Sequence, residues 1–214
     1  MKPFTTDDLV ACYRQGVFPM AQGRDRTGVF IVDPDERCIF PLERFHVPRR
    51  LRRTLRSGRF AFSVDRDFRA VMEACAAPAP GRTETWINRD IHALYQALAR
   101  RGLAHSVEAR QDGALVGGLY GVAIGGAFFG ESMFSRVTDA SKAALVHLVA
   151  RLRYGGFRLL DAQFPTPHLE QFGAETIPRR IFHAVLGAAL DVPADFGALP
   201  EDASADQILE VLDR

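Results

Sequence analysis

Residues 105–134 read HSVEARQDGALVGGLYGVAIGGAFFGESMF, and this stretch decides the fold. It holds three strand-like segments, residues 105–111, 114–124 and 127–134, with Asp112-Gly113 and Gly125-Gly126 between them. Asp-Gly and Gly-Gly pairs favour two-residue hairpin turns because both positions tolerate a positive φ. The stretch therefore predicts a three-stranded antiparallel meander.

A helix and another strand are predicted after the meander. Apolar residues recur at helical spacing over residues 140–154, Gly155-Gly156 ends this helix, and residues 157–164 form a strand. Because a helix connects it to the last meander strand, the two strands should be parallel. Upstream, residues 60–64 alternate like a strand, and two helices follow before the meander.

This order of elements is similar to that of the GCN5-type acyltransferase fold, in which the strands before and after the long helix splay apart. The segment before residue 60 is irregular, with turn signals at Asp33-Pro34-Asp35 and Phe40-Pro41-Leu42. We therefore expect an α+β protein. It has a small N-terminal domain over residues 1–60 and an acyltransferase-like domain with a mixed sheet over residues 61–214.

Charge is close to balanced over the 214 residues, with a net charge of +1, which predicts no global attraction to nucleic acid. One short segment is strongly basic and the tail after residue 191 is acidic. The predicted basic helix after Pro48 carries Arg49, Arg50, Arg52, Arg53 and Arg56. Such a patch suits a docked polyanion, and the alternative is an ordinary solvated arginine face.

Cysteine content and the N-terminus predict the compartment. The three cysteines, Cys12, Cys38 and Cys75, form no CxxC pair, which fits a reducing compartment and neither a disulfide framework nor a metal site. Asp7-Asp8 interrupts any signal-like apolar run, and no apolar stretch approaches the roughly 20 residues of a membrane helix. We expect a cytoplasmic monomer with no membrane partner.

Three polar residues are candidates for chemistry. Residues i and i+2 of a strand share a face, so Asp161 and Gln163 should project together, and Glu131 ends the neighbouring strand. Phe128 and Met133 supply apolar walls nearby, and an apolar pocket with a few convergent polar groups is the usual form of a ligand site. The alternative is that Asp161 and Glu131 are structural acids paired with Arg136 or Arg179.

Two further residues have more than one interpretation. Trp86, the single tryptophan, is either a core or hinge residue or a stacking platform for a base. Lys142, at the start of the predicted helix, is either a phosphate contact or a surface residue. The turn between Phe134 and Ala143 holds no glycine, and this argues against the pyrophosphate loop by which acyl-CoA users of this fold hold their cofactor.

A series of motifs then carries a family resemblance. In chain order they are YRQGVFP (13–19), WIN (86–88), AHSVE (104–108), LVGGLYG (115–121), GESMFS (130–135), ASK (140–142), DxQ (161–163) and IPRR (177–180). The series resembles the leucyl/phenylalanyl-tRNA–protein transferase family, in the same order and from about residue 13 to residue 187.

The resemblance implies an enzyme that needs no cofactor and no metal. It would transfer leucine, phenylalanine or methionine from aminoacyl-tRNA to the α-amine of proteins that begin with Arg or Lys. The new N-terminus marks the protein for degradation under the N-end rule. The resemblance assigns a catalytic relay to Asp161 and Gln163: Gln163 would accept a hydrogen bond from the attacking amine, and Asp161 would polarise and orient Gln163. It also places Glu131 in the same pocket, where it would bind the cationic acceptor.

The resemblance also assigns the substrate contacts. The expected pocket for the donor side chain is formed by Leu119, Phe128, Leu145 and Leu160, with Ser132 and Met133 beside Glu131. Trp86 matches an aromatic residue that contacts the terminal adenosine. The basic segment, Arg49, Arg50, Arg52, Arg53 and Arg56, becomes a docking face for the tRNA acceptor stem, with Lys142 as a further backbone contact.

The chain departs from the family pattern at two places. Many members have Trp-Trp-Ser-Pro-Asp-Pro-Arg where this chain reads IVDPDER at 31–37, so Val32 cannot repeat a stacking contact made by the second Trp. Thr166 replaces the usual Asn after the Asp-x-Gln motif. The alternative functions are an acyl-CoA-dependent N-acyltransferase and a non-catalytic adaptor that binds protein N-termini.

Overall fold

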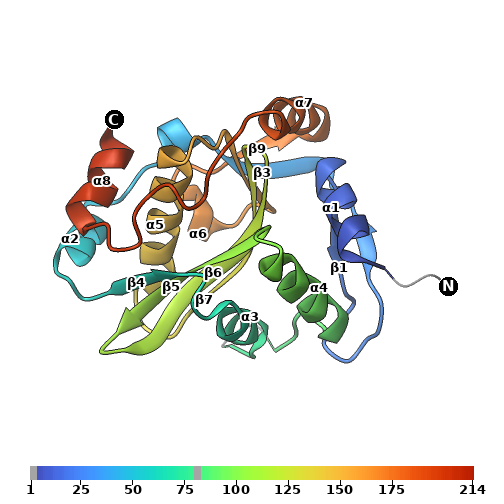
Figure 1. The fold of residues 1–214 in the computed structure, drawn as a ribbon, viewed down its shortest axis with the longest axis horizontal. Helices are drawn as coiled ribbons and strands as arrows, with labels where there is room; N and C mark the ends of the chain where they lie inside the picture. Colours follow the sequence, from blue (N-terminus) through green and yellow to red (C-terminus); the bar gives the residue numbers. More distant parts are fainter. Residues whose placement is uncertain (1–3, 80–82) are drawn as a thin grey trace.

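The computed structural model describes residues 4–79 and 83–214 as an α+β fold (Figure 1). The strands are β1 (Phe18–Met20), β2 (Phe30–Val32), β3 (Glu36–Phe40), β4 (Ala61–Val64), β5 (Ala104–Gln111), β6 (Ala114–Ile124), β7 (Ala127–Ser135), β8 (Leu159–Gln163) and β9 (Glu175–Pro178). The helices are α1 (Thr6–Arg14), the 3₁₀ turn η1 (Leu42–Arg44), α2 (Arg49–Arg56), α3 (Phe68–Ala76), α4 (Arg89–Arg100), α5 (Ala140–Tyr154), α6 (Pro167–Glu170), α7 (Arg179–Leu190) and α8 (Ala205–Asp213).

The predicted meander is confirmed as the centre of a seven-stranded sheet of order β4-β5-β6-β7-β8-β3-β9. Strands β5, β6 and β7 pair antiparallel through turns at Asp112-Gly113 and Gly125-Gly126. Strand β8 pairs parallel to β7, as the α5 crossover requires. The sheet is therefore mixed, as the sequence predicts.

The N-terminal part of the chain contributes to this sheet. Strands β1 and β2 form a separate two-stranded sheet, but β3 lies between β8 and β9 and pairs antiparallel with both. The division into domains at residue 60 stays a prediction, and a strand from before that point is part of the large sheet. This placement brings residues 36–40 next to the Asp-x-Gln motif.

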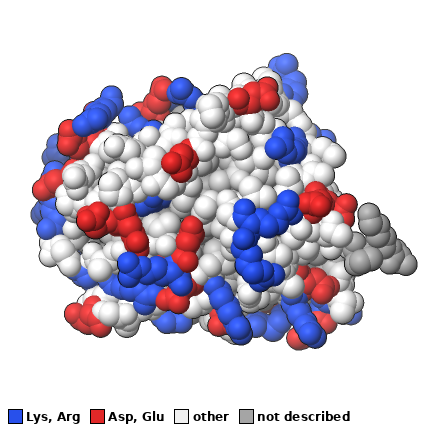
Figure 2. Space-filling model, viewed as in Figure 1, with Lys and Arg blue, Asp and Glu red and all other residues white. Residues whose placement is uncertain are grey.

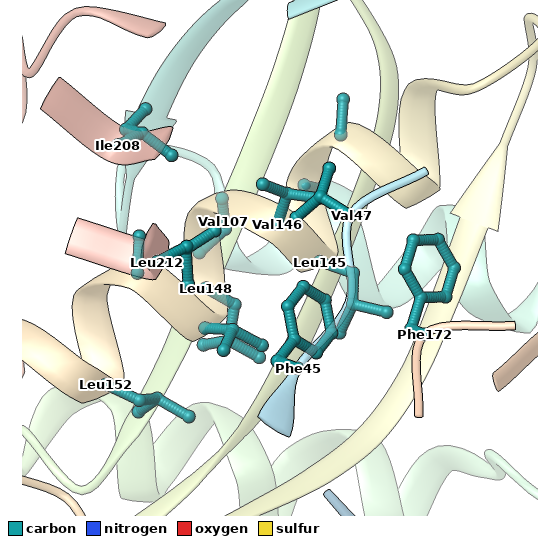
Figure 3. Close-up of a cluster of buried hydrophobic side chains, with 14 of the residues drawn as sticks. Phe45, Val47, Val107, Leu145, Val146, Leu148, Leu152, Phe172, Ile208 and Leu212 are labelled. Carbon is teal, nitrogen blue, oxygen red and sulfur yellow. The ribbon is translucent and has the colours of Figure 1, made fainter. Parts of the chain in front are cut away.

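Helices cover both faces of the sheet and enclose two apolar cores. On one face, α5 packs with α2 and α8 over residues such as Leu145, Leu148 and Ile208 (Figure 3). On the other face lie α1, α3, α4 and α7, with Tyr13, Tyr95 and Phe182 in the core. Within the described residues, no helix is long and apolar enough to cross a membrane.

Local sequence explains where the main helices begin. Thr5 and Asp8 form a reciprocal capping box at the start of α1. The Asn88 side chain accepts the Ile91 N–H at the start of α4. Helix α5 follows Asp139, whose φ of 70° turns the chain from β7 into the helix.

Candidate active site

A cavity of about 280 Å³ opens where strands β7 and β8 diverge. The two strands pair only through residues 127–129 and 159–161, and beyond this point residues of both strands line the cavity. Residues from β3, β6, β7, α5, β8 and the following loop line it: Phe40, Leu119, Tyr120, Gly130, Glu131, Ser132, Met133, Leu145, Leu148, Leu160, Asp161, Ala162, Gln163, Phe164, Thr166, His168 and Leu169. Most of the wall is apolar, and its polar end is formed by Glu131, Asp161 and Gln163, which are joined by hydrogen bonds.

Eight of the residues singled out from the sequence line this cavity. They are Leu119, Glu131, Ser132, Met133, Leu145, Leu160, Asp161 and Gln163. Phe128 does not line it, because its ring is fully buried in the core and stacks on Phe196 with centroids 5.5 Å apart. Trp86 lies elsewhere, partly buried beside a small hollow formed with residues 21–23, 84 and 85.

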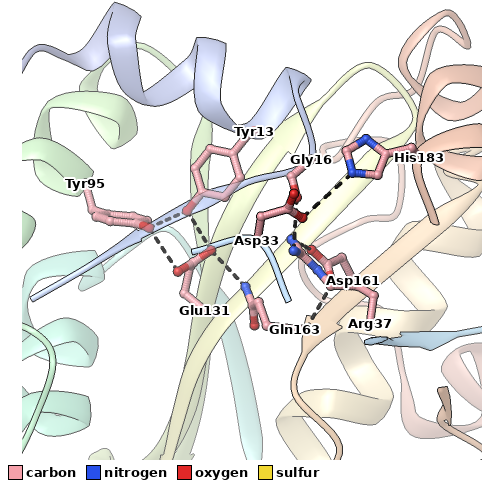
Figure 4. Close-up of polar contacts among 9 residues, drawn as sticks. All are labelled: Tyr13, Gly16, Asp33, Arg37, Tyr95, Glu131, Asp161, Gln163 and His183. Atoms are coloured by element: carbon pink, nitrogen blue, oxygen red, sulfur yellow. Dashed lines mark hydrogen bonds and ion pairs between the residues drawn. The ribbon is translucent and has the colours of Figure 1, made fainter. Parts of the chain in front are cut away.

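Asp161 is a buried, ion-paired carboxylate, and its partner is Arg37. Arg37 Nε donates to Asp161 Oδ1 at 2.9 Å and Nη2 donates to Oδ2 at 2.7 Å (Figure 4). The alternative interpretation named Arg136 or Arg179 as the partner, and this assignment is wrong. Arg136 donates to the Leu115 carbonyl, and Arg179 pairs with acidic residues of the β2–β3 loop.

Gln163 ends β8 in an unusual backbone conformation. Its φ is +56°, a left-handed value that non-glycine residues adopt at a cost. The register between β3 and β8 shifts at this point, so the two-residue repeat of the strand stops. The Gln163 N–H donates to Asp161 Oδ1 at 2.9 Å, and its side-chain Nε2 donates to Glu131 Oε1 at 3.1 Å.

Glu131 receives hydrogen bonds from two tyrosines that the sequence analysis did not single out. Tyr13 Oη donates to Oε1 at 2.7 Å and Tyr95 Oη donates to Oε2 at 2.9 Å (Figure 4). The two phenol oxygens also contact each other. When Glu131 is ionised, both phenols donate to it and no hydrogen is left for the contact between the two hydroxyls. When Glu131 is protonated, it donates to one tyrosine instead of accepting from it, and the ring then has a hydrogen for every contact.

The ionisation of Glu131 is shifted accordingly. Burial raises its pKa from 4.5 to about 7, while the Tyr13 and Tyr95 hydrogen bonds act in the opposite direction. The same site raises the pKa of both tyrosines well above their usual value, chiefly by burial, so they remain neutral donors. The polar end of the cavity thus holds an acid that changes charge near neutral pH.

The sequence profile described as "Leucyl/phenylalanyl-tRNA protein transferase" matches residues 39–187, and the profile of that protein's N-terminal domain matches residues 3–35. The chain belongs to the leucyl/phenylalanyl-tRNA protein transferase family. Three relatives named "Leucyl/phenylalanyl-tRNA--protein transferase" illustrate the similarity. The protein from Phenylobacterium zucineum is 61% identical over 207 residues, which cover 96% of this chain and 94% of the relative.

The other two relatives match over similar lengths. The protein from Maricaulis maris is 54% identical over 210 residues, covering 98% of this chain and 97% of the relative. The protein from Paramagnetospirillum magneticum is 60% identical over 196 residues, covering 92% and 94%. The leucyl/phenylalanyl-tRNA protein transferase family is therefore matched over nearly the whole chain, including the strands that line the cavity.

The basic helix α2 of this family member packs on the acidic helix α8. Arg52 pairs with Asp213, and Arg56 pairs with Asp206. Blue and red side chains intermingle along the edge where Figure 1 places α2 and α8 (Figure 2). Arg49, Arg52, Arg53 and Arg56 line a shallow hollow.

The remaining basic candidates differ in their surroundings. Arg49, Arg50 and Arg53 form no ion pair with any residue that the structure describes. Lys142 lies in the first turn of α5, where its Nζ is 3.3 Å from Asp139 Oδ1. Between residues 4 and 214, apart from 80–82, no group of three or more His, Cys, Asp or Glu side chains is arranged to hold a metal ion.

Proposed function

We propose that this protein transfers leucine, phenylalanine or methionine from aminoacyl-tRNA to the α-amine of proteins that begin with Arg or Lys. The observation that carries the proposal is the cavity itself. In a chain 54–61% identical to leucyl/phenylalanyl-tRNA–protein transferases, an apolar wall ends at a glutamate that changes charge near neutral pH. The wall suits an apolar donor side chain, and the polar end suits an amine.

The donor is already activated, so the site has to position two reactants. The α-amine, with a pKa of about 7.7–8.0, is partly neutral at pH 7 and attacks the ester carbonyl carbon. A C–N bond forms, the ester C–O bond breaks, and the ribose oxygen of the tRNA leaves with the proton that the amine loses. Holding amine and ester in register can supply about 7–11 kcal/mol of the barrier.

Gln163 is placed to receive the amine. Its Nε2 is engaged by Glu131, which fixes the amide orientation and leaves its carbonyl oxygen to accept a hydrogen bond from the attacking amine. Asp161 lies behind it and orients Gln163 through the backbone N–H. Both residues belong to the proposed catalytic relay.

Glu131 provides the countercharge for a cationic acceptor. Its carboxylate is partly buried at the polar end of the cavity, where an Arg or Lys N-terminus would bring one or two positive charges. Leu119, Met133, Leu145 and Leu160 supply the apolar wall for the donor side chain, with Ser132 beside Glu131. Phe128 supports this wall from the core behind it.

The tRNA is proposed to dock on the basic helix α2. Among the described residues, Arg49, Arg50 and Arg53 have no ion-pair partner, and Arg49 and Arg53 line one hollow with Arg52 and Arg56. Lys142 and Trp86 are proposed as contacts to the tRNA backbone and the terminal adenosine. Because the reaction uses tRNA, we propose that the protein acts in the cytoplasm, where the modified proteins enter N-end rule degradation. We also propose that it acts as a monomer.

The test is a transfer assay with charged Leu-tRNA and a peptide that begins with Arg. Wild-type protein should label the peptide without coenzyme A, and Asp161→Asn and Gln163→Ala should each slow transfer while the protein stays folded. Gln111→Ala, at the far end of β5, is the matched control and should transfer normally.

The alternatives give different results in the same assay. Saturable binding of acetyl-CoA would favour an acyl-CoA-dependent enzyme. Binding of the peptide without label transfer would favour a non-catalytic adaptor. Near-normal turnover of both Asp161→Asn and Gln163→Ala would contradict the catalytic relay.

A further inference from the structure

We propose that Arg37 is a positioning residue for the transfer reaction, because it holds Asp161, and through it Gln163, in the reactive arrangement. This inference rests on the proposed function. Arg37 lies on β3, outside the cavity lining, and its side chain is only 1% exposed. It would act on the substrates through other residues and would not touch them.

The Arg37 guanidinium donates three hydrogen bonds, two to Asp161 and one to the backbone of the turn at Gly16. Two parallel hydrogen bonds hold both oxygens of Asp161. This bidentate geometry fixes the orientation of the carboxylate, and the positive charge of the guanidinium balances its negative charge. The third bond runs from Nη1 to the Gly16 carbonyl at 3.0 Å. Lysine cannot reproduce this planar fork.

Two aromatic rings hold the guanidinium in its plane. The Phe18 ring centroid is 4.5 Å from the Arg37 Cζ and the Phe182 centroid is 4.4 Å away. Both rings are buried, and they come from β1 and α7. Stacking of this kind on buried rings restricts the side chain to one position and adds to the attraction.

The N-terminal turn that contacts Arg37 is equally constrained. Gly16 has a φ of +79°, and a Cβ at this position would lie 2.9 Å from the His183 ring. Only glycine therefore allows the turn to direct its carbonyl at Arg37 while it packs on α7. Arg37 thus joins four segments of the chain behind the cavity.

The effect reaches the cavity through Gln163. Its left-handed conformation is opposed by its own Cβ, and the hydrogen bond from its N–H to Asp161 Oδ1 offsets that cost. With Asp161 released by Arg37, Gln163 would return to an extended strand conformation. Its amide would then leave Glu131, and the group that receives the amine would be misplaced.

The test compares Arg37→Lys and Arg37→Met with Arg151→Lys. Arg151 is the matched control, because it is also a buried arginine, 2% exposed, but it donates to carbonyls of Phe196 and Leu199, away from the cavity. Steady-state transfer kinetics are measured on the folded fraction. Hydrogen exchange of the Gln163 amide, followed by NMR, reports its bond to Asp161 without reference to activity.

The expected result separates kcat from KM. Arg37→Lys should lower kcat by about 100-fold, as expected for a reacting group displaced by about 1 Å, with little change in either KM. The Gln163 amide should exchange at least about 10-fold faster. Arg151→Lys should lower thermal stability and leave kcat and the Gln163 amide unchanged. If Arg37→Met does not fold, Arg37→Lys decides the question.

Two results would overturn the proposal. In the first, Arg37→Lys has a kcat and a Gln163 amide exchange rate close to those of the wild type. The other is an equal loss of kcat in Arg37→Lys and Arg151→Lys, which would make Arg37 a general stabilising residue. If wild-type protein transfers no amino acid, the proposed function fails, and exchange at Gln163 alone then decides whether Arg37 positions it.

Discussion

Replacing Glu131 by glutamine should stabilise the protein at pH 8 and not at pH 5. The side chains have the same shape, and glutamine supplies the hydrogen atom that the carboxylate lacks. The new amide nitrogen can donate to the Tyr95 oxygen, Tyr95 to Tyr13, and Tyr13 to the carbonyl oxygen of the new amide. The ring seen around Glu131 then closes without a titrating group.

The magnitude follows from the raised pKa of Glu131. Between pH 4.5 and about 7 the folded protein keeps a proton that the unfolded chain releases. The contribution of Glu131 to the stability of the wild type therefore falls as pH rises through this range and is constant above it. The rise from 4.5 to about 7 corresponds to roughly 3 kcal/mol, and partial exposure reduces this to on the order of 2 kcal/mol.

The assay is urea unfolding of wild type, Glu131→Gln and a control at pH 5 and pH 8. The control is Glu43→Gln, an exposed glutamate in η1. The stability of Glu131→Gln relative to wild type should rise by about 2 kcal/mol between the two pH values, and that of the control should not change. An equal difference at both pH values would refute the account of the buried acid.

Three further predictions concern other parts of the molecule. The double variant Asp206→Asn with Asp213→Asn removes the ion pairs of Arg52 and Arg56 with α8. It should raise the affinity for tRNA several-fold at low salt and by less at high salt, because two cations of α2 are freed. An unchanged affinity would show that α2 is not part of the docking face. Trp86→Ala should raise KM for aminoacyl-tRNA, and an unchanged KM would assign this residue to the hinge or core. Gly125→Ala should lower the free energy of unfolding by more than about 1 kcal/mol, because the φ of Gly125 is +54° and a Cβ there would lie 2.2 Å from the Leu190 carbonyl oxygen. An unchanged melting temperature would contradict this prediction.

Sequence reasoning predicted the parts of the fold that depend on local chemistry. The meander follows from strand-like segments joined by an Asp-Gly and a Gly-Gly turn, and the parallel strand follows from the intervening helix. It also brought Glu131, Asp161 and Gln163 to one slot, because neighbouring strands of a sheet place their ends together. These inferences use contacts between segments adjacent in the chain or joined by one crossover.

The contacts that sequence reasoning missed join distant segments. Arg37 and Asp161 are 124 positions apart, and Tyr13 and Glu131 are 118 apart. No spacing rule pairs such residues before the position of β3 in the sheet is known. The left-handed Gln163 was also missed, because the rule that i and i+2 share a face holds only within a regular strand.

The central claim is that the chain joins an amino acid from a charged tRNA to a protein N-terminus. The most direct measurement is the intact mass of a peptide that begins with Arg, after incubation with the protein and charged Leu-tRNA. The account predicts a gain of one leucine residue, located on the α-amine by fragmentation, and no gain when that amine is acetylated. An unchanged mass with active, folded protein, or leucine on the acetylated peptide, would contradict it.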